Sequence, residues 1–328
     1  MILATKLLYN DQILTEAAKR FGSSMQQTKD LGGFESFVYE IERGDGRQYI
    51  MKITHSVRRT KDYLMGELEF VNYLAANGVQ TPAAVPSVNG ELIEIIEAKE
   101  GYFLAYAFEK AEGRLVEAKD WSIDFAQEWG RVLGQMHRLT KDYIPSKPSY
   151  KRQEWLEGDV FVNRRKYIPT DKKHEKALEV FDALLKEIDE LPKTKDSYGL
   201  IHNDLHHNNF FITPNQKIIP FDFDDGEYHY FINDIAIILY HLIRHNKFDF
   251  LKKGSVDFVL SHLMEGYRKE NSLDDFWLQK LPLFVRKRHA LFLSVYYMIW
   301  EGEELNEEQL EWLEQLRREV EEKDELIF

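Results

Sequence analysis

The strongest constraint on the fold is residues 201–225, where short apolar runs alternate with clusters of acidic and amide side chains. The segment begins IHNDLHHNN, continues with the apolar run FFI and the turn TPNQ at 213–216, and ends in FDFDD after a second apolar run. Two apolar runs separated by such a turn predict a β-hairpin. Carboxylate and amide groups therefore stand at both ends of the predicted hairpin.

Three of these polar side chains, Asp204, Asn209 and Asp222, could converge at the base of the hairpin. An Asp that receives a hydroxyl group, with an Asn and an Asp that hold magnesium, is a set of side chains used in phosphoryl transfer from ATP. Their carboxylate and amide oxygens are the hard ligands that suit Mg²⁺. The residues thus predict a reaction and leave its acceptor open.

The N-terminal part of the chain reads as a small, strand-rich lobe. A helical pattern over 5–21 precedes a glycine pair, a strand over 31–42, an Asp-Gly turn and a strand over 49–53. A helix follows at 63–77, and two more strands at 92–97 and 102–108.

The remainder of the chain is predominantly helical. Apolar residues recur at helical spacing over 123–138, 176–190, 233–244, 256–268, 275–297 and 307–322. We therefore expect an α+β fold with an N-lobe at 1–108 that binds nucleotide phosphates. A C-lobe at 109–328 would carry the catalytic loop, the metal site and the acceptor site. The 328 residues suffice for two such lobes.

The motifs and their order resemble the aminoglycoside phosphotransferase and choline kinase superfamily, which has a two-lobed protein-kinase-like fold. That family carries a pattern close to HGDLHxxN, an apolar-DFD strand and DLA; this chain has HNDLHHNN at 202–209, FDFD at 221–224 and DIA at 234–236. The resemblance covers nearly the whole chain. Asn203 replaces the usual Gly, a mild change because Asn tolerates left-handed backbone. His207-Asn208 replaces the common Pro-Gly, and neither change removes a catalytic group.

The resemblance implies a role for each hairpin residue. Asp204 would be the catalytic base, while Asn209 and Asp222 would ligate Mg²⁺. Asp224 would be either an auxiliary metal ligand or only an exposed carboxylate at the end of a strand.

Three further residues have supporting places in the resemblance. His202 would brace the catalytic loop, and Asp234 would accept backbone N–H groups from it. His137 matches a recurrent family position and is expected to be a packed histidine rather than a ligand.

Nucleotide contacts are implied in the N-lobe. Lys52 would contact the α- and β-phosphates of ATP and pair with Glu67. Glu69 is a rival for that pairing. We favour Glu67 because it stands two helical turns before Leu74, on the core-facing side of its helix.

The remaining nucleotide contacts come from the loop and the hinge. Gly32 and Gly33 would open the loop over the phosphates, and Ser36 would add a hydroxyl to the β-phosphate. Adenine would bond to backbone groups at the hinge, near Phe108 and Lys110. A preference for ATP over GTP cannot be derived from these residues.

Composition excludes several classes of partner. A net charge of −13 argues against nucleic acid; it suits a cationic acceptor or only a solvated acidic surface. The chain has no cysteine and its N-terminus does not read as a signal peptide, so we expect a cytoplasmic protein. Its longest apolar stretches are too short to span a bilayer. Oligomeric state stays open.

The acceptor would be a small molecule with a hydroxyl group: an aminoglycoside, an amino alcohol, homoserine or a sugar. Acidic side chains could attract an amine, whereas Arg286 or Arg288 could receive a carboxylate. A protein Ser/Thr kinase and a nucleotide-binding pseudokinase are alternatives on the same fold. A zinc hydrolase built on the histidines near Asp204 is a remote one, because it leaves Lys52 and Asn209 without roles.

Overall fold

The computed structural model describes residues 3–33, 36–244 and 255–322, which fall into two compact units. The first, here called the sheet unit, comprises Met1–Arg114, Tyr143–Arg152 and Phe211–Asp224. The second, the helical unit, comprises Leu115–Asp142, Gln153–Phe210 and Asp225–Phe328. Two segments from the later chain thus pack with the N-terminal part, and the functional division at residue 108 stays a prediction.

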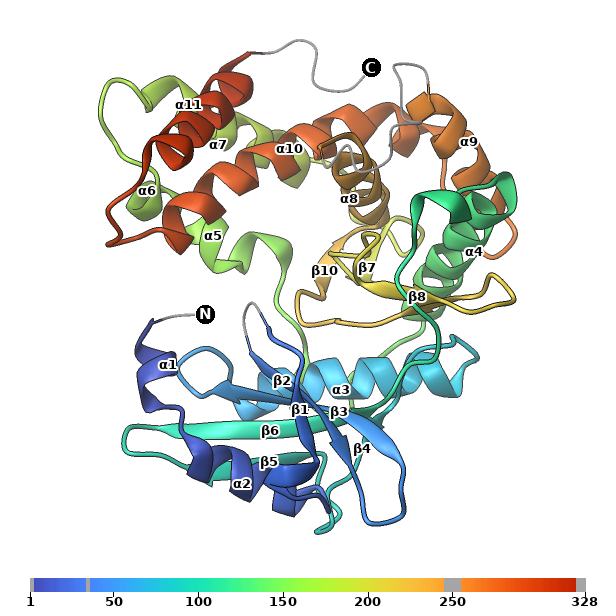
Figure 1. The fold of residues 1–328 in the computed structure, drawn as a ribbon. Helices are drawn as coiled ribbons and strands as arrows, with labels where there is room; N and C mark the ends of the chain where they lie inside the picture. The colour runs from blue at the N-terminus through green and yellow to red at the C-terminus, as the bar shows by residue number, and fades with distance from the viewer. Residues whose placement is uncertain (1–2, 34–35, 245–254, 323–328) are drawn as a thin grey trace. The chain divides into compact units, whose positions relative to one another are not determined.

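The sheet unit is built on an antiparallel sheet of strand order β1-β2-β3-β6-β4, with β5 also paired to β6. Hydrophobic side chains alternate between its two faces, as the period of a strand requires. Met51 and Ile53 pack with helix α2 on one face, whereas Leu104 and Tyr106 pack with α3 on the other (Figure 1). Its elements are α1 Leu3–Leu8, α2 Asp11–Arg20, β1 Thr28–Asp30, β2 Phe37–Glu42, β3 Gln48–His55, α3 Lys61–Ala76, β4 Ala84–Val85, β5 Ile93–Glu97 and β6 Tyr102–Glu109.

The helical pattern over 5–21 forms two helices, α1 and α2, with a break between them. Helix α1 ends at Leu8, and Asn10 begins α2, because its side chain accepts the backbone N–H groups of Gln12 and Ile13 at 2.9 and 3.2 Å. Such capping satisfies the first free donors of a helix, and it outweighed the apolar periodicity that runs across the break. The strand expected over 31–42 begins later, at β2; its residues 34–35 lie outside the described residues.

The predicted hairpin is confirmed. Strand β8 (Phe210–Ile212) pairs with β9 (Ile218–Pro220), and Thr213 and Lys217 close the turn through a backbone hydrogen bond of 2.9 Å. A second pair joins β7 (Tyr198–Ile201) to β10 (Glu227–Tyr230), which the sequence pattern did not predict. The polar loop at 202–209 connects β7 to β8.

The helical unit packs its helices at close range. A Cβ on Gly130 of α4 would lie 1.8 Å from the backbone oxygen of Leu263 in α9, so only glycine allows this approach. The helices are α4 Ile123–Thr140, α5 Asp159–Val162, α6 Arg164–Tyr167, α7 Glu175–Asp189, α8 Phe231–Arg244, α9 Ser255–Tyr267, α10 Asp275–Ile299 and α11 Glu307–Glu321. Among the described residues, no helix has both the length and the apolar character needed to cross a bilayer.

Candidate active site

The loop at 202–209, here called the catalytic loop, is held by one buried carboxylate. Asp234, in the first turn of α8, accepts the backbone N–H of Asn203 at 2.7 Å and that of His202 at 3.2 Å. The His137 ring lies 3.1 Å from the same carboxylate. Asn203 has φ 64°, in the left-handed region that Asn adopts more readily than most residues. The loop conformation is therefore set by α8.

Asp204 lies inside this loop, with Asn209 beside it. The Asn209 amide nitrogen donates to the Asp204 carboxylate at 2.8 Å and to its backbone oxygen at 2.9 Å. The His202 ring accepts the Asp204 backbone N–H at 3.3 Å. Because the nitrogen of the Asn209 amide is engaged in these bonds, its oxygen is left for another ligand.

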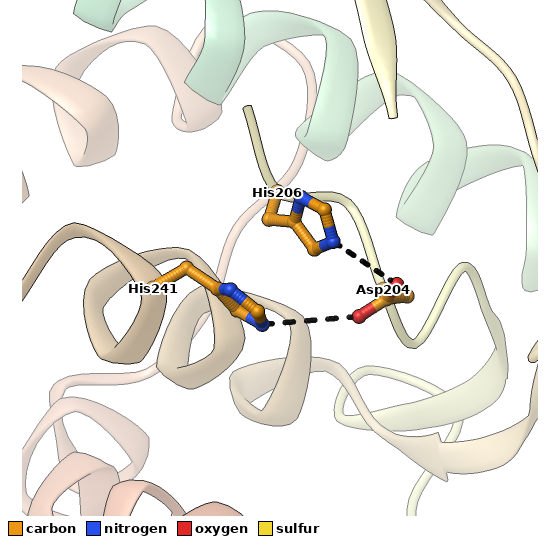
Figure 2. Close-up of side chains that lie close together, drawn as sticks. All are labelled: Asp204, His206 and His241. Carbon is orange, nitrogen blue, oxygen red and sulfur yellow. Dashed lines mark ion pairs between the residues drawn. The ribbon is translucent and has the colours of Figure 1, made fainter. Parts of the chain in front are cut away.

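Basic side chains from two helices also surround Asp204. The guanidinium of Arg288, on α10, donates to its Oδ1 at 2.6 Å. His206 and His241 direct their rings at the same carboxylate from 3.3 and 4.0 Å (Figure 2). Burial alone would raise the pKa of Asp204, but the His206 hydrogen bond and the Arg288 charge outweigh it and hold the pKa far below its usual value. Sequence reasoning did not connect Arg288 or His241 with Asp204, and no spacing signal links them.

The same cluster resembles a metal site only in part. One ligand atom each from Asp204, His206 and His241 lie within 4.8 Å of one another. However, the Arg288 Nη2 stands 2.6 Å from Asp204 Oδ1 and 3.4 Å from His241 Nε2. A guanidinium at that place repels a divalent ion. The positive charge of the Arg288 guanidinium therefore lies within this cluster, and the cluster does not fit a zinc ion.

The sheet unit holds the predicted phosphate-binding lysine. Lys52 lies on β3 opposite Tyr106 of β6, on the face covered by α3. Its Nζ forms an ion pair with Asp222 Oδ1 at 2.5 Å. Burial would lower the pKa of Lys52, but the Asp222 charge outweighs it and keeps the pKa well above the usual value. Asp222 has φ 66°, a strained conformation that is common at functional sites.

Glu67 is on the core-facing side of α3, as the helical spacing predicted; it is 2% exposed. Among the described residues, neither of its carboxylate oxygens has a hydrogen-bond partner, so the expected ion pair with Lys52 is not formed. Burial, with the Asp224 charge adding to it, raises the pKa of Glu67 to about 7. Glu69 instead accepts the backbone N–H of Ser146 at 3.1 Å.

The Asp224 carboxylate forms ion pairs with two arginines. Its two oxygens accept from Arg58 at 2.7 Å and from Arg59 at 3.4 Å. Burial would raise the pKa of Asp224, but the charges of Arg59 and Arg58 hold it far below the usual value. A carboxylate engaged in this way is poorly placed to ligate a metal ion, so Asp222 is the better ligand.

Of the other predicted nucleotide contacts, Gly32, Gly33 and Ser36 precede β2, Phe108 lies on β6, and Lys110 directly follows β6. Gly32 has φ 71°, and a Cβ on Gly33 would lie 2.0 Å from the backbone oxygen of Ser36, so both glycines are required by the backbone. Ser36 is buried. Phe108 has its ring centre 5.9 Å from the Lys52 Nζ. The Lys110 amine is engaged by Glu40 at 2.9 Å and Gln48 at 2.8 Å.

The predicted magnesium ligands have the expected chemistry, each within its own unit. Asn209 has an amide oxygen that its hydrogen bonds leave unused. Asp222 is paired with Lys52 through only one oxygen, and its side chain is 44% exposed. Each of these oxygen donors is of the kind that Mg²⁺ prefers.

Comparison with known proteins gives consistent matches. A model of the phosphotransferase enzyme family matches residues 27–268. Amicoumacin kinase of Bacillus subtilis (strain 168) is 40% identical over 318 residues, which are 96% of this chain and 93% of that protein.

Solved structures give the same result. Amicoumacin kinase hAmiN, in complex with AMP-PNP, Ca²⁺ and Ami, has a TM-score of 0.91 and 37% identity, covering 96% of this chain and 94% of its own. The microcompartment-associated aminopropanol kinase has a TM-score of 0.77 at 18% identity, covering 95% of each chain, and is alike in fold.

Proposed function

Because the chain belongs to the phosphotransferase enzyme family, we propose that it transfers the γ-phosphoryl group of ATP to a hydroxyl group of amicoumacin, with Mg²⁺ as its metal ion. The protein-kinase-like fold expected from the sequence is confirmed, and the chain is a phosphotransferase of small molecules with an alcohol group as acceptor. Support for amicoumacin comes from the 40% identity to an amicoumacin kinase over 96% of the chain.

Asp204 would receive the acceptor hydroxyl. Its Oδ1 accepts one short hydrogen bond, from Arg288, and keeps a lone pair for the hydroxyl proton, whereas Oδ2 is approached by both Asn209 and His206. The hydroxyl oxygen bonds to the γ-phosphorus while the bond from phosphorus to the ADP oxygen breaks. The proton passes to Asp204 late and then to solvent. A weakly basic carboxylate suffices, because a loose transition state rewards positioning more than basicity.

Asn209 and Asp222 would hold Mg²⁺, which neutralises charge on the phosphate oxygens when bound. Lys52 would exchange its ion pair with Asp222 for contacts with the nucleotide phosphates. Glu67 would then be its buried partner on α3, since its carboxylate has no hydrogen bond to any of the described residues. The strained backbone of Asp222 supports a role in binding rather than in stability.

The test is an ADP-release assay on the purified full chain with ATP, Mg²⁺ and amicoumacin. We expect release to depend on the acceptor, to stop with a metal chelator, and to return with added Mg²⁺. Mass spectrometry should find one phosphoryl group on the acceptor. Asp204→Asn should lower kcat by about 10²-fold or more with nucleotide binding retained.

Other acceptors in the same assay distinguish the alternatives. Turnover with homoserine, an amino alcohol or an aminoglycoside, but none with amicoumacin, would keep the enzyme class and overturn the acceptor. Equal ADP release by the wild type and the Asp204→Asn variant, with every acceptor, would overturn the kinase proposal.

A further inference from the structure

The residues around Asp204 include one that the family pattern does not assign. Arg288 lies on α10, 84 positions after Asp204, and the residue is 8% exposed. Resting on the proposed function, we propose that Arg288 is a positioning residue: it fixes the orientation of the Asp204 carboxylate for the acceptor hydroxyl.

The contacts of Arg288 hold the carboxylate from one side. Its Nη2 donates to Asp204 Oδ1 at 2.6 Å, while Asn209 donates to the other oxygen, Oδ2, at 2.8 Å. Two donors on different oxygens prevent rotation of the carboxylate about its Cβ–Cγ bond. The remaining lone pair of Oδ1 keeps a fixed direction, which is what in-line attack on a phosphorus atom requires.

Arg288 is itself held in place. Its Nη2 also lies 3.4 Å from His241 Nε2, and the guanidinium carbon stands 5.0 Å from the ring centre of Phe292. A planar guanidinium can contact a carboxylate, an imidazole and an aromatic ring at once, whereas a lysine amine is a point charge. The identity of this residue as arginine therefore matters beyond its charge.

Stability alone is a weak explanation for this ion pair. Buried ion pairs contribute little net stability, because desolvation of both charges offsets their attraction. The Arg288 Nε is also buried and finds no hydrogen-bond partner in the part of the chain that the structure describes, which adds a further cost. The pair is better explained by the orientation that it gives to Asp204.

Arg244 offers a matched control in the same unit. It forms an ion pair with Glu319 at 2.9 Å, and its guanidinium carbon stands 5.2 Å from the ring centre of Trp312. One of its nitrogens is also buried without a hydrogen-bond partner among the residues that the structure describes. It has the same chemistry as Arg288, but its carboxylate partner is on α11.

The experiment compares Arg288→Lys and Arg288→Ala with Arg244→Lys in the full chain, with amicoumacin and ATP as substrates. We expect Arg288→Lys to lower kcat by about 10- to 100-fold while both KM values stay within about twofold. The Arg244→Lys variant should keep the kcat of the wild type. Ethylguanidinium should restore part of the kcat of Arg288→Ala, and thermal unfolding with ADP-binding calorimetry verifies that each variant is folded.

Each result has a defined meaning. A kcat of Arg288→Lys equal to that of the wild type overturns the inference, as does a change confined to the acceptor KM, which would make Arg288 a binding residue. An equal fall in Arg244→Lys would assign the loss to a general effect of arginine removal and also overturn it. Absence of acceptor-dependent turnover in the wild type instead overturns the proposed function.

Discussion

Lys287, a buried lysine next to Arg288 in the chain, allows the free-energy cost of burying a protonated amine to be measured. Lys287 is 2% exposed, and its amine lies 3.0 Å from the His229 Nε2. The ring centres of Trp155 and Phe161 are 5.8 and 5.3 Å away. Burial lowers the pKa of Lys287 from 10.5 to about 7, although the charge of Glu227 acts in the opposite direction. We predict that Lys287→Met stabilises the protein at neutral and acidic pH.

The magnitude follows from the two pKa values. At about 1.4 kcal/mol for each pKa unit, the difference between 10.5 and about 7 penalises the protonated amine by roughly 5 kcal/mol. The lost contact with His229 offsets about 1 kcal/mol of the gain. Between the two pKa values the unfolded chain binds a proton that the folded protein does not, so wild-type stability rises with pH across this window. Below about pH 7 both states are protonated, and the penalty is fully present.

Urea unfolding followed by tryptophan fluorescence measures this effect at about pH 6, about pH 8 and about pH 10. The free energy of unfolding of Lys287→Met should exceed that of the wild type by roughly 3–4 kcal/mol at about pH 6, and the excess should vanish by about pH 10. Lys280→Met, a half-buried position on the same helix, should differ from the wild type by about 0.5 kcal/mol or less at every pH. A difference between Lys287→Met and the wild type that stays constant with pH would refute the reasoning.

Three further predictions concern packing and the catalytic loop. Gly130→Ala should lower the free energy of unfolding by about 2–3 kcal/mol, because its Cβ would clash with the backbone oxygen of Leu263; Gly44→Ala, in open space, should change it by about 0.5 kcal/mol or less. A Gly130→Ala protein with the wild-type melting temperature would contradict this. Asp234→Ala should lower the free energy of unfolding by about 3 kcal/mol or more and lower kcat, because two N–H groups of the loop lose their acceptor. A free energy of unfolding within about 1 kcal/mol of the wild type, measured with denaturant, would count against it. Asn203→Gly should change the free energy of unfolding by about 1 kcal/mol or less, since relief of strain in the left-handed backbone offsets the lost side-chain hydrogen bonds. A loss above about 2 kcal/mol in the same assay would contradict this prediction.

Much of the fold could be predicted because its signals are local. The hairpin follows from apolar runs around a turn, and Glu67 was placed on the core-facing side of its helix by spacing alone. Where two local signals competed, the capping side chain of Asn10 divides the helical pattern over 5–21 into two helices.

The reaction class could be read from the amino-acid order, because Asp204, Asn209 and Asp222 stand in one short segment. The charges that face these residues depend on how distant elements pack. Arg288 contacts Asp204 although 84 positions separate them, and Asp224 accepts hydrogen bonds from arginines far earlier in the chain. Spacing encodes neighbours along one helix or hairpin, whereas contacts between distant elements depend on how those elements pack. That packing sets the burial and charge around each group, and so the pKa of Asp204 and of Glu67.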